Sequence, residues 1–471
     1  MKKERTTKCQ PLMTKKKKFK FPSSTLMLFS IIVIIAILTY IVPAGQYAYV
    51  DQGGTQVVDG SSFQYVEQNP VNPFRVFVAI QEGFLNGAQI IFLILFGYFW
   101  VYSVMQTGAF TAMINRLLGS KARDSKLFIP IVMLVFSLAG STYGEFETVY
   151  GLIPIFVALA IALGYDALVG MCMSGVAVAV GFASATTNPF TIGIAQTFGD
   201  LPMFSGLGYR WVIFGVFYLV SMALVMRYAM KVKKDPTKSL VYGEDYSAFK
   251  VETDANMEFT AKHKLLMLGM VVTVITIVYG SLKLGWYINE MSGVFIISGI
   301  LSSVIGGKRP EGIATDLITS ISEMTVAMVV VGLSRTILVI MQNGVIIDTV
   351  IHGMNSMMQG LPTWATGEMM LVVQNILNFF IPSGSGQAAA IMPIMIPLAD
   401  LTELNRQIAV LAYQFGDGFS NLLWPTGACA IMCGIAKIPM GKWYKFFLPI
   451  FGIMFLLQSF FVILAVFIGY H

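Results

Sequence analysis

Long apolar blocks recur along the chain and are separated by shorter polar segments. The clearest blocks are Thr25–Ala44, Ala88–Met105, Trp211–Met230, Leu265–Tyr279, Phe295–Ile305 and Phe446–Ile468. A helix needs about 20 mostly apolar residues to cross the hydrocarbon core of a bilayer. Because several blocks approach or reach this length with few charges, the pattern predicts an all-α polytopic membrane protein.

Two apolar segments are too short to cross a bilayer, and each ends in a polar, glycine-rich turn. Leu127–Ala139 is followed by Gly140-Ser-Thr-Tyr-Gly-Glu-Phe-Glu147, and Met369–Ile381 is followed by Pro382-Ser-Gly-Ser-Gly-Gln387. Segments of this length reach only about 20 Å of the roughly 30 Å core. We therefore expect a re-entrant hairpin in each half, with its polar tip near the middle of the membrane.

The two halves of the chain share motifs at a nearly constant spacing. Met105-Gln-Thr-Gly108 recurs 236 positions later as Met341-Gln-Asn-Gly344. Ser184 precedes Pro189 by five residues, just as Ser420 precedes Pro425. These matches predict two homologous repeats. Counting crossings from a cytoplasmic N-terminus puts the two glycine motifs on opposite faces, so we expect the repeats to be inverted, as in many secondary transporters.

This pattern defines the predicted organisation. A basic cytoplasmic tail (1–24) is followed by a first repeat (25–230), a polar cytoplasmic linker (231–262) and a second repeat (263–471). We expect about nine transmembrane helices, two re-entrant hairpins and two broken helices. Their places are an external loop (45–85), a hairpin (about 127–163) and a broken helix (about 166–198) in the first repeat, then a hairpin (about 363–400) and a broken helix (about 402–433) in the second.

Composition and charge support membrane residence. Of the 471 residues, 56% are hydrophobic and only 12% are charged, against about 25% charged in soluble domains. The net charge of +6 reflects topology, since nine of the 31 basic residues lie in the first 20 positions. Basic residues gather on the cytoplasmic side of membrane proteins. We therefore expect a bacterial cytoplasmic (inner) membrane protein with a cytoplasmic N-terminus, in contact with lipid and not with nucleic acid.

Each hairpin is followed by a helix that a proline must interrupt, at Pro189 and at Pro425. The ends of a broken helix offer free amides to anions and free carbonyls to cations. The alternative is an ordinary kink whose hydroxyl neighbours satisfy the freed carbonyls. The predicted substrate or ion site comprises Ser141, Thr142, Gly144, Glu145, Ser184, Thr187, Asn188, Thr191, Arg335, Ser383, Gly384, Ser385, Gly386, Gln387, Asp417, Ser420, Asn421 and Thr426.

Charges inside membrane segments are costly, at roughly 2.5–3.5 kcal/mol each near the centre. Asp417 could bind a cation, a proton or a substrate ammonium, or it could form a structural ion pair with Arg335. Arg335 could instead bind a substrate carboxylate through its planar fork of donors. Glu147 either joins the site or lies at the wet edge of the hairpin.

The sequence contains little that indicates an enzyme, a metal or a bound cofactor. The four cysteines form neither a disulfide framework nor a plausible metal site. A hydrolase using Ser385 would need a base in the membrane, and His263, His352 and His471 all fall outside clear spans. We expect no metal and no cofactor, with coupling to Na+ or H+ left open. A channel is the remaining alternative.

Several segments are distinctive of one transporter family. The second half contains Phe379-Phe-Ile-Pro-Ser-Gly-Ser-Gly-Gln-Ala388, Pro397-Leu-Ala-Asp400 and Ala412-Tyr-Gln-Phe-Gly-Asp-Gly-Phe-Ser420, and the first half contains Asn188-Pro-Phe190 and Lys234-Asp-Pro-Thr-Lys-Ser-Leu240. From about Phe21 to its C-terminus the chain resembles the YfcC branch of the anaerobic four-carbon dicarboxylate carrier (DcuC-type) family. One departure is Glu145-Phe-Glu147, where family members carry adjacent glutamates.

The resemblance implies an ion-transporter-superfamily fold, in which a core with hairpins and broken helices moves against a scaffold, often within a homodimer. It implies a small-molecule substrate but leaves two classes, because similar proteins are associated with four-carbon dicarboxylates or with arginine–ornithine exchange. The predicted core has up to three carboxylates and one arginine. Since a dianion would prefer the reverse balance, we favour an exchanger of a basic amino acid over a dicarboxylate carrier.

Overall fold

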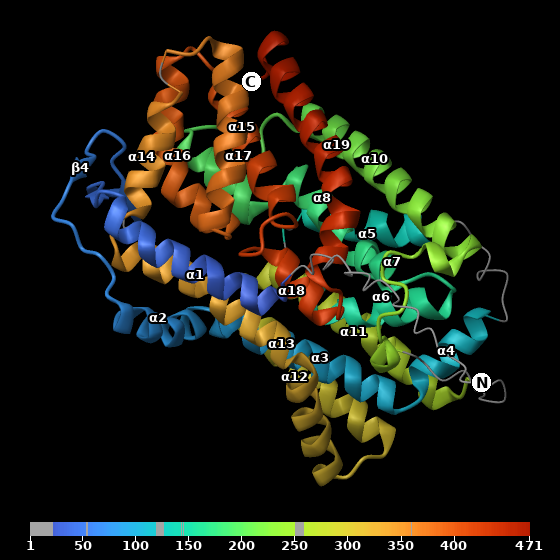
Figure 1. Ribbon diagram of the computed structural model, residues 1–471. Helices are drawn as coiled ribbons and strands as arrows, with labels where there is room; N and C mark the ends of the chain where they lie inside the picture. Colours follow the sequence, from blue (N-terminus) through green and yellow to red (C-terminus); the bar gives the residue numbers. More distant parts are fainter. Residues whose placement is uncertain are drawn as a thin grey trace, which may run out of the picture.

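The computed structural model describes residues 22–52, 55–118, 127–142, 144, 146–249, 259–358 and 360–471. These residues are almost entirely helical (Figure 1). The first repeat contains α1 Ser24–Ile41, α2 Pro73–Asn86, α3 Ala88–Gln106, α4 Ala109–Leu118, α5 Phe128–Thr142, α6 Thr148–Ala162, α7 Ala167–Met171, α8 Ala177–Ala183, α9 Ile194–Phe198 and α10 Leu207–Lys234. The second contains α11 Ala261–Leu284, α12 Ile288–Gly306, α13 Pro310–Asn343, α14 Ile347–Ser356, α15 Thr363–Phe380, α16 Gly384–Leu401, α17 Arg406–Ser420, α18 Ala428–Ile435 and α19 Met440–Phe467.

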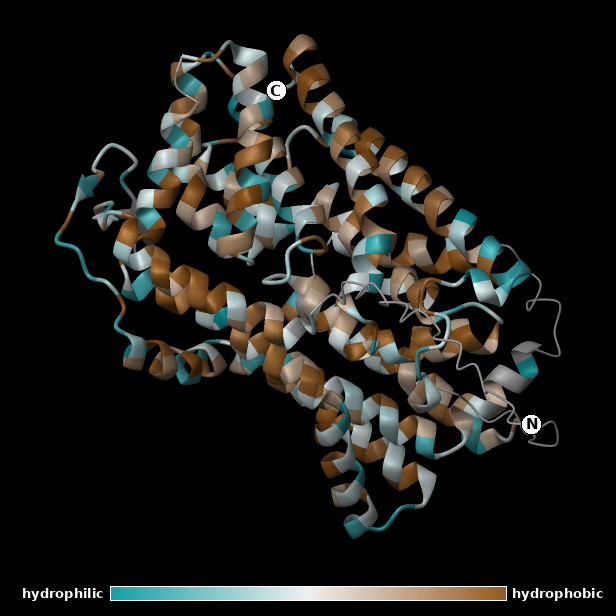
Figure 2. Cartoon of the chain, in the orientation of Figure 1, coloured by the Kyte–Doolittle hydropathy of each residue, from teal (hydrophilic) through white to brown (hydrophobic). Residues whose placement is uncertain are grey.

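Six described helices are long and apolar enough to cross a membrane, namely α3, α10, α11, α12, α13 and α19. The helices α1, α5 and α6 are also apolar but shorter, as is the stretch from α7 to α8. Many large apolar side chains on the outer helices are exposed, such as Ile34 on α1 and Leu456 on α19. Figure 2 shows that these outer helices are mostly hydrophobic. A surface of this kind suits lipid contact. The predicted all-α membrane fold is confirmed, whereas the count of nine spans is not.

The helices of the second repeat recur in the order of the first. A spanning helix and a short helix (α3 and α4, α13 and α14) precede two hairpin arms (α5 and α6, α15 and α16). A helix broken in two follows, and a 28-residue helix ends each repeat, α10 in the first and α19 in the second. The shared motifs lie at equivalent points, because Gly108 and Gly344 each follow the end of a spanning helix.

The chain segregates into two groups of helices (Figure 1). One group, which we call the scaffold, comprises α1–α3 and α11–α13, with α13 packed on α1, α2 and α3, and α12 packed on α3 and α11. The other, which we call the core, comprises the two pairs of arms and the broken helices, flanked by α10 and α19. Within the core, α5 packs on α8, α15 on α17, and α17 on α8. The core thus joins elements of both repeats.

The segment between α1 and α3 is more structured than the predicted loop (45–85). The strands Gly45–Gln46 and Gln64–Tyr65 pair antiparallel, as do Tyr49–Gln52 and Thr55–Val58. The prediction of a loop was incomplete, because α2 occupies the rest of the segment. Asn72 caps this helix by accepting a hydrogen bond from the amide of Arg75 at 2.8 Å. A side-chain cap of this kind stabilises the first turn of a helix.

Glycine allows the closest helix contacts. A Cβ atom on Gly181 of α8 would lie 1.8 Å from the carbonyl oxygen of Ser137 on α5. Between scaffold and core, a Cβ on Gly97 of α3 would lie 2.8 Å from the Cα of Gly151 on α6. Small residues let helix backbones approach closely where lipid supplies no hydrophobic drive to association. The hairpin arm α5 is therefore fixed against α8 by backbone contact.

We predict that Gly181→Ala destabilises the protein by about 1–3 kcal/mol, because the added methyl group overpacks the α5–α8 contact. Gly215→Ala on α10 is the matched control, since a Cβ there meets no atom within 4 Å. Alanine is otherwise the better helix former, so the control should melt at or above the wild-type temperature in detergent. Equal melting temperatures for the two variants would contradict the packing argument.

Candidate substrate-binding site

In the first repeat, the hairpin tip satisfies the backbone of the broken helix. The carbonyl oxygen of Ser141 accepts hydrogen bonds from the amides of Thr186, at 2.8 Å, and Thr187, at 3.2 Å. The Ser141 hydroxyl donates to the carbonyl of Ser184 at 3.0 Å, and the Thr187 hydroxyl donates to the carbonyl of Thr142 at 3.2 Å. These bonds replace the helical bonds lost between α8 and α9, which lipid could not replace.

Asn188 ends the break and restarts the helix. Its side-chain oxygen accepts from the amides of Phe190, at 2.9 Å, and Thr191, at 3.3 Å, while Pro189 occupies the first helical position, which needs no amide donor. Gly144 lies against Asn188 with φ +76°, and a Cβ atom there would overlap the Asn188 amide. The first tip therefore needs glycine at 144 both for its backbone conformation and for this contact.

The second repeat uses the same kind of contact between tip and break. Thr426, in the break between α17 and α18, donates its hydroxyl hydrogen to the carbonyl of Phe379 at 2.7 Å. Tyr413 of α17 donates to the carbonyl of Gly384 at 2.6 Å. In this repeat too, the hairpin tip and the broken helix supply hydrogen-bond partners to one another.

Asp417 lies where the two repeats meet. Its Oδ1 atom accepts hydrogen bonds from the side-chain amides of Asn378, at 2.8 Å, and Asn421, at 3.3 Å. A Cβ atom on Gly384 would lie 2.9 Å from Asp417 Oδ2 and 2.6 Å from Cγ2 of Thr191, which belongs to the first repeat. Among the described residues, neither Asp417 Oδ2 nor the Thr191 hydroxyl has a hydrogen-bond partner, although both are buried.

A chain of amides supports the second tip from behind. Gln387 donates to the side-chain oxygen of Gln374 at 2.7 Å, and Asn378 donates to the side-chain oxygen of Gln387 at 3.1 Å. Asn378 also binds Asp417, so the network links both arms of the hairpin to the broken helix α17. These bonds hold the Asp417 carboxylate in a fixed orientation.

A cavity of about 50 Å³ opens between the second tip and α13. Its walls are Ile90, Phe146, Glu147, Tyr150, Phe182, Val331, Ser334, Arg335, Pro382, Ser383, Gly384, Asn421, Thr426, Gly427, Ala428 and Ile431. Two of these carry opposite charges. Glu147 and Arg335 are close enough for a Coulomb interaction, yet the salt bridges among the described residues do not include this pair. A ligand with both charges could lie between them.

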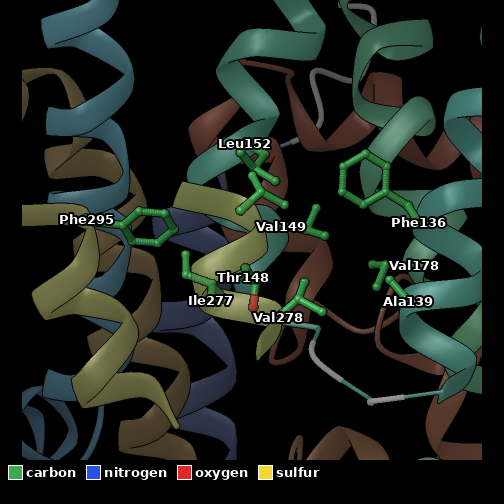
Figure 3. A pocket seen from close by; sticks show the side chains of 10 residues that line it. Phe136, Ala139, Thr148, Val149, Leu152, Val178, Ile277, Val278 and Phe295 are labelled. Atoms are coloured by element: carbon green, nitrogen blue, oxygen red, sulfur yellow. The ribbon is translucent and has the colours of Figure 1, made fainter. Parts of the chain in front are cut away.

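A second cavity, of about 30 Å³, lies beside the first hairpin and faces α11 and α12 (Figure 3). Apolar side chains such as Phe136, Val149 and Phe295 line it, and the hydroxyl of Thr148 is its main polar group. A charged ligand would lose its hydration there without compensation. This cavity is therefore a packing void between core and scaffold. It does not suit the binding of an ion.

The structure brings only part of the predicted set to the cavity wall, namely Arg335, Ser383, Gly384, Asn421 and Thr426. Behind the tips lies a layer formed by Asp417, Thr191, Asn188 and Gly144. The backbone groups of the first tip and break are hydrogen-bonded through Ser141, Thr142, Ser184 and Thr187. Three further residues lie apart from the wall: Ser385, Gly386, whose amide donates to the Ser383 hydroxyl, and Ser420, whose hydroxyl donates to the carbonyl of Gly416. Glu145 lies outside the described residues. Asp417 and Arg335 form no ion pair.

Sequence analysis did not assign several residues that the structure places at the site. Tyr150 lines the cavity beside Glu147, for which the sequence left two interpretations. Gln374 and Asn378 are polar residues one helical turn apart in an apolar hairpin arm, and this spacing was a signal that could have identified them. Among the residues that the structure describes, no group of His, Cys, Asp and Glu is arranged to hold a metal ion.

Two transporters of known structure cover 95% of this chain at 15% sequence identity, each with a TM-score of 0.42. One is YdaH of Alcanivorax borkumensis, and the match covers 99% of its chain. The other is MtrF of Neisseria gonorrhoeae, and the match covers 96% of its chain.

Sequence relatives cover nearly the whole chain. A protein of Escherichia coli (strain K12) named "Putative basic amino acid antiporter YfcC" is 29% identical, over 97% of this chain and 98% of the relative. An uncharacterized protein of Haemophilus influenzae is 26% identical, over 96% of this chain and 98% of the relative. The family model described as "DcuC: C4-dicarboxylate anaerobic carrier" matches residues 21–467. The predicted resemblance is thus confirmed, and the chain belongs to the DcuC family of transporters.

Proposed function

We propose that this transporter is a secondary exchanger of a small charged metabolite, in the first place a basic amino acid such as arginine or ornithine. The observation that carries the proposal is the presence of Glu147 and Arg335 in one cavity without a salt bridge between them. An amino acid has a carboxylate for the guanidinium of Arg335 and a cationic group for Glu147. Charge-assisted hydrogen bonds of this kind are stronger than neutral ones.

The balance of charge favours a cationic side chain on the substrate. Glu147 lines the cavity and Asp417 lies one layer behind it, within Coulomb range of Glu147. A single guanidinium opposes these two carboxylates. A four-carbon dicarboxylate, as in the description of the family, would place two more negative charges in this field and is the second candidate.

The size of the cavity supports alternating access. An engineered cavity that binds benzene measures about 150 Å³, whereas this one measures about 50 Å³. An amino acid can therefore enter only if the second tip and α13 separate. Such a movement of the core against the scaffold would open the site to one side of the membrane at a time.

We further propose that Asp417 binds the coupling cation or proton, or the ammonium group of the substrate. Its Oδ2 atom lies next to Gly384 and the Thr191 hydroxyl, and neither oxygen has a partner among the described residues, which supports this role. The uneven distribution of basic residues supports a cytoplasmic membrane location with the N-terminus inside.

Two substitutions distinguish the substrate classes in liposomes that exchange labelled arginine or a labelled dicarboxylate. Glu147→Gln should raise the arginine concentration that half-saturates transport about 10- to 100-fold. The reason is that it removes one charge-assisted hydrogen bond of about 1.5–3 kcal/mol. Arg335→Gln should weaken the binding of every substrate that carries a carboxylate. Glu311→Gln, at the exposed start of α13, is the control and should behave as the wild type.

A dicarboxylate substrate would give the opposite result, because Glu147→Gln would then preserve or improve transport. Flux that rises linearly with concentration and never saturates would contradict a carrier and indicate a channel.

We predict that Asp417→Asn lowers the exchange rate about tenfold or more while the protein still inserts and folds. Asparagine has nearly the same shape and can keep a side-chain bond to Asn378, so only the charge is lost. Asp235→Asn, at the C-terminal cap of α10, serves as the control. Wild-type exchange by Asp417→Asn, at normal protein levels in the membrane, would exclude Asp417 from the site.

A further inference from the structure

A groove on the scaffold shares no wall residue with the cavity of the candidate substrate site. It has a volume of about 380 Å³ and lies between α11 and α12. At about 30 Å³ for each water-sized group, it holds roughly a dozen such groups. Its walls are Leu265, Leu266, Gly269, Val272, Thr273, Thr276, Trp286, Val294, Ile297, Ser298, Leu301, Ser302 and Ile305.

The groove follows one face of each helix along its length. The α11 positions 265, 269, 272 and 276 are three or four residues apart, as are the α12 positions 294, 297, 301 and 305, and such positions share a helix face. The Thr273 and Ser298 hydroxyls hydrogen-bond to one another at 2.8 Å, which removes the main polar groups from the floor. The apolar side chains Leu265, Val272 and Leu301 are each more than half exposed. The groove is thus apolar and open along its side.

The two ends of the groove differ. Trp286 packs on Gly280 at one end, and indole rings favour the interface between membrane and water. Lys262 extends the groove-lining face of α11 at the other end, where its ammonium group donates to the carbonyl of Gly306 at 2.7 Å. Arg309 is exposed beside the same end. Basic groups therefore gather at one mouth of an apolar groove.

The acidic groups at this mouth do not cancel the charge. Lys308 pairs with Asp316 at 2.5 Å, which uses both of these charges. Lys262 keeps two of its three ammonium hydrogens for other acceptors. Glu311 lies two residues from Arg309 and is exposed. Among the described residues at this mouth, Lys262, Lys308 and Arg309 outnumber Asp316 and Glu311 by one charge.

We propose that this groove binds one anionic phospholipid, with an acyl chain between α11 and α12 and the phosphate at Lys262 and Arg309. The apolar floor matches the chain, and the basic mouth matches the headgroup. Basic pockets between membrane helices are known to bind anionic headgroups. Charge complementarity distinguishes this occupant from a second copy of the chain, whose α11–α12 pair would bring the same positive mouth.

The proposal can be tested by native mass spectrometry of the full-length protein in detergent with equal amounts of phosphatidylglycerol and phosphatidylethanolamine. The wild type should retain phosphatidylglycerol preferentially. Arg309→Ala should reduce this preference about fivefold, and adding Lys262→Ala should reduce it by a similar factor again. Lys283→Ala, near the opposite end of α11, should leave the preference unchanged.

A second pair of variants tests the acyl chain. A Cβ on Gly269 meets no atom within 4 Å, so Gly269→Leu should fold normally and fill the groove, lowering retention of both lipids. Gly452→Leu on α19, where space is equally open, is the control. Equal retention of the two lipids by the wild type, or unchanged retention by Gly269→Leu and Arg309→Ala, would overturn the proposal. A wild-type dimer that Gly269→Leu dissociates would do the same, because a second copy would then fill the groove.

Discussion

The architecture depends on one constraint, which is that lipid offers no hydrogen-bond partner to a bare backbone. Two hairpin tips and two helix breaks lie within the core, and each tip meets the break of its own repeat. Ser141 accepts from the amides of Thr186 and Thr187, and Thr426 donates to the carbonyl of Phe379. The polar turns therefore satisfy one another, and their glycines allow the contact to be close.

Because the backbone amides and carbonyls of the tips and breaks hydrogen-bond to one another, only a small set of side chains remains available to bind a ligand. Asp417 has one oxygen bound by asparagines and one without a partner in the part of the chain that the structure describes, while Glu147 and Arg335 share a cavity without a salt bridge. Charges buried without full pairing destabilise a membrane fold. Their arrangement around one cavity is understandable if a substrate with charges of both signs completes the pairing during each cycle.

Local sequence features predicted the fold well because they act over short distances. In the first repeat the arms α5 and α6 have 15 residues each, as their short apolar segments suggested, and Pro189 and Pro425 marked the breaks. In the second repeat α15 and α16 have 18 residues each, so the prediction of a 13-residue arm was wrong and length alone did not separate these arms from spans. Contacts between segments far apart in the sequence were harder to predict. Nothing local indicated that Glu147 would face Arg335, or that Asn378 and not Arg335 would bind Asp417. The helix α2 was also missed, because its 14 residues are too few to span a bilayer and the whole segment was assigned to an external loop.

The same limits apply to the site. Motifs around residues 184–191 and 420–426 identified the breaks, but many of their hydroxyls serve the backbone and do not reach the cavity. Ser184 and Ser420, for example, both donate to carbonyls one turn earlier in their own helices. The hydroxyl content of a break therefore indicates how the break is stabilised. The proposal for what the site binds rests instead on the charged residues Glu147 and Arg335 in the cavity wall.

The most direct test is an experimental structure in lipid nanodiscs with a saturating basic amino acid. The account predicts density for the amino acid between Glu147 and Arg335, its carboxylate on the guanidinium, with both hairpin tips enclosed in protein near the middle of the bilayer. Density at another place, or a tip that emerges into solvent as the turn between two complete spans, would contradict it.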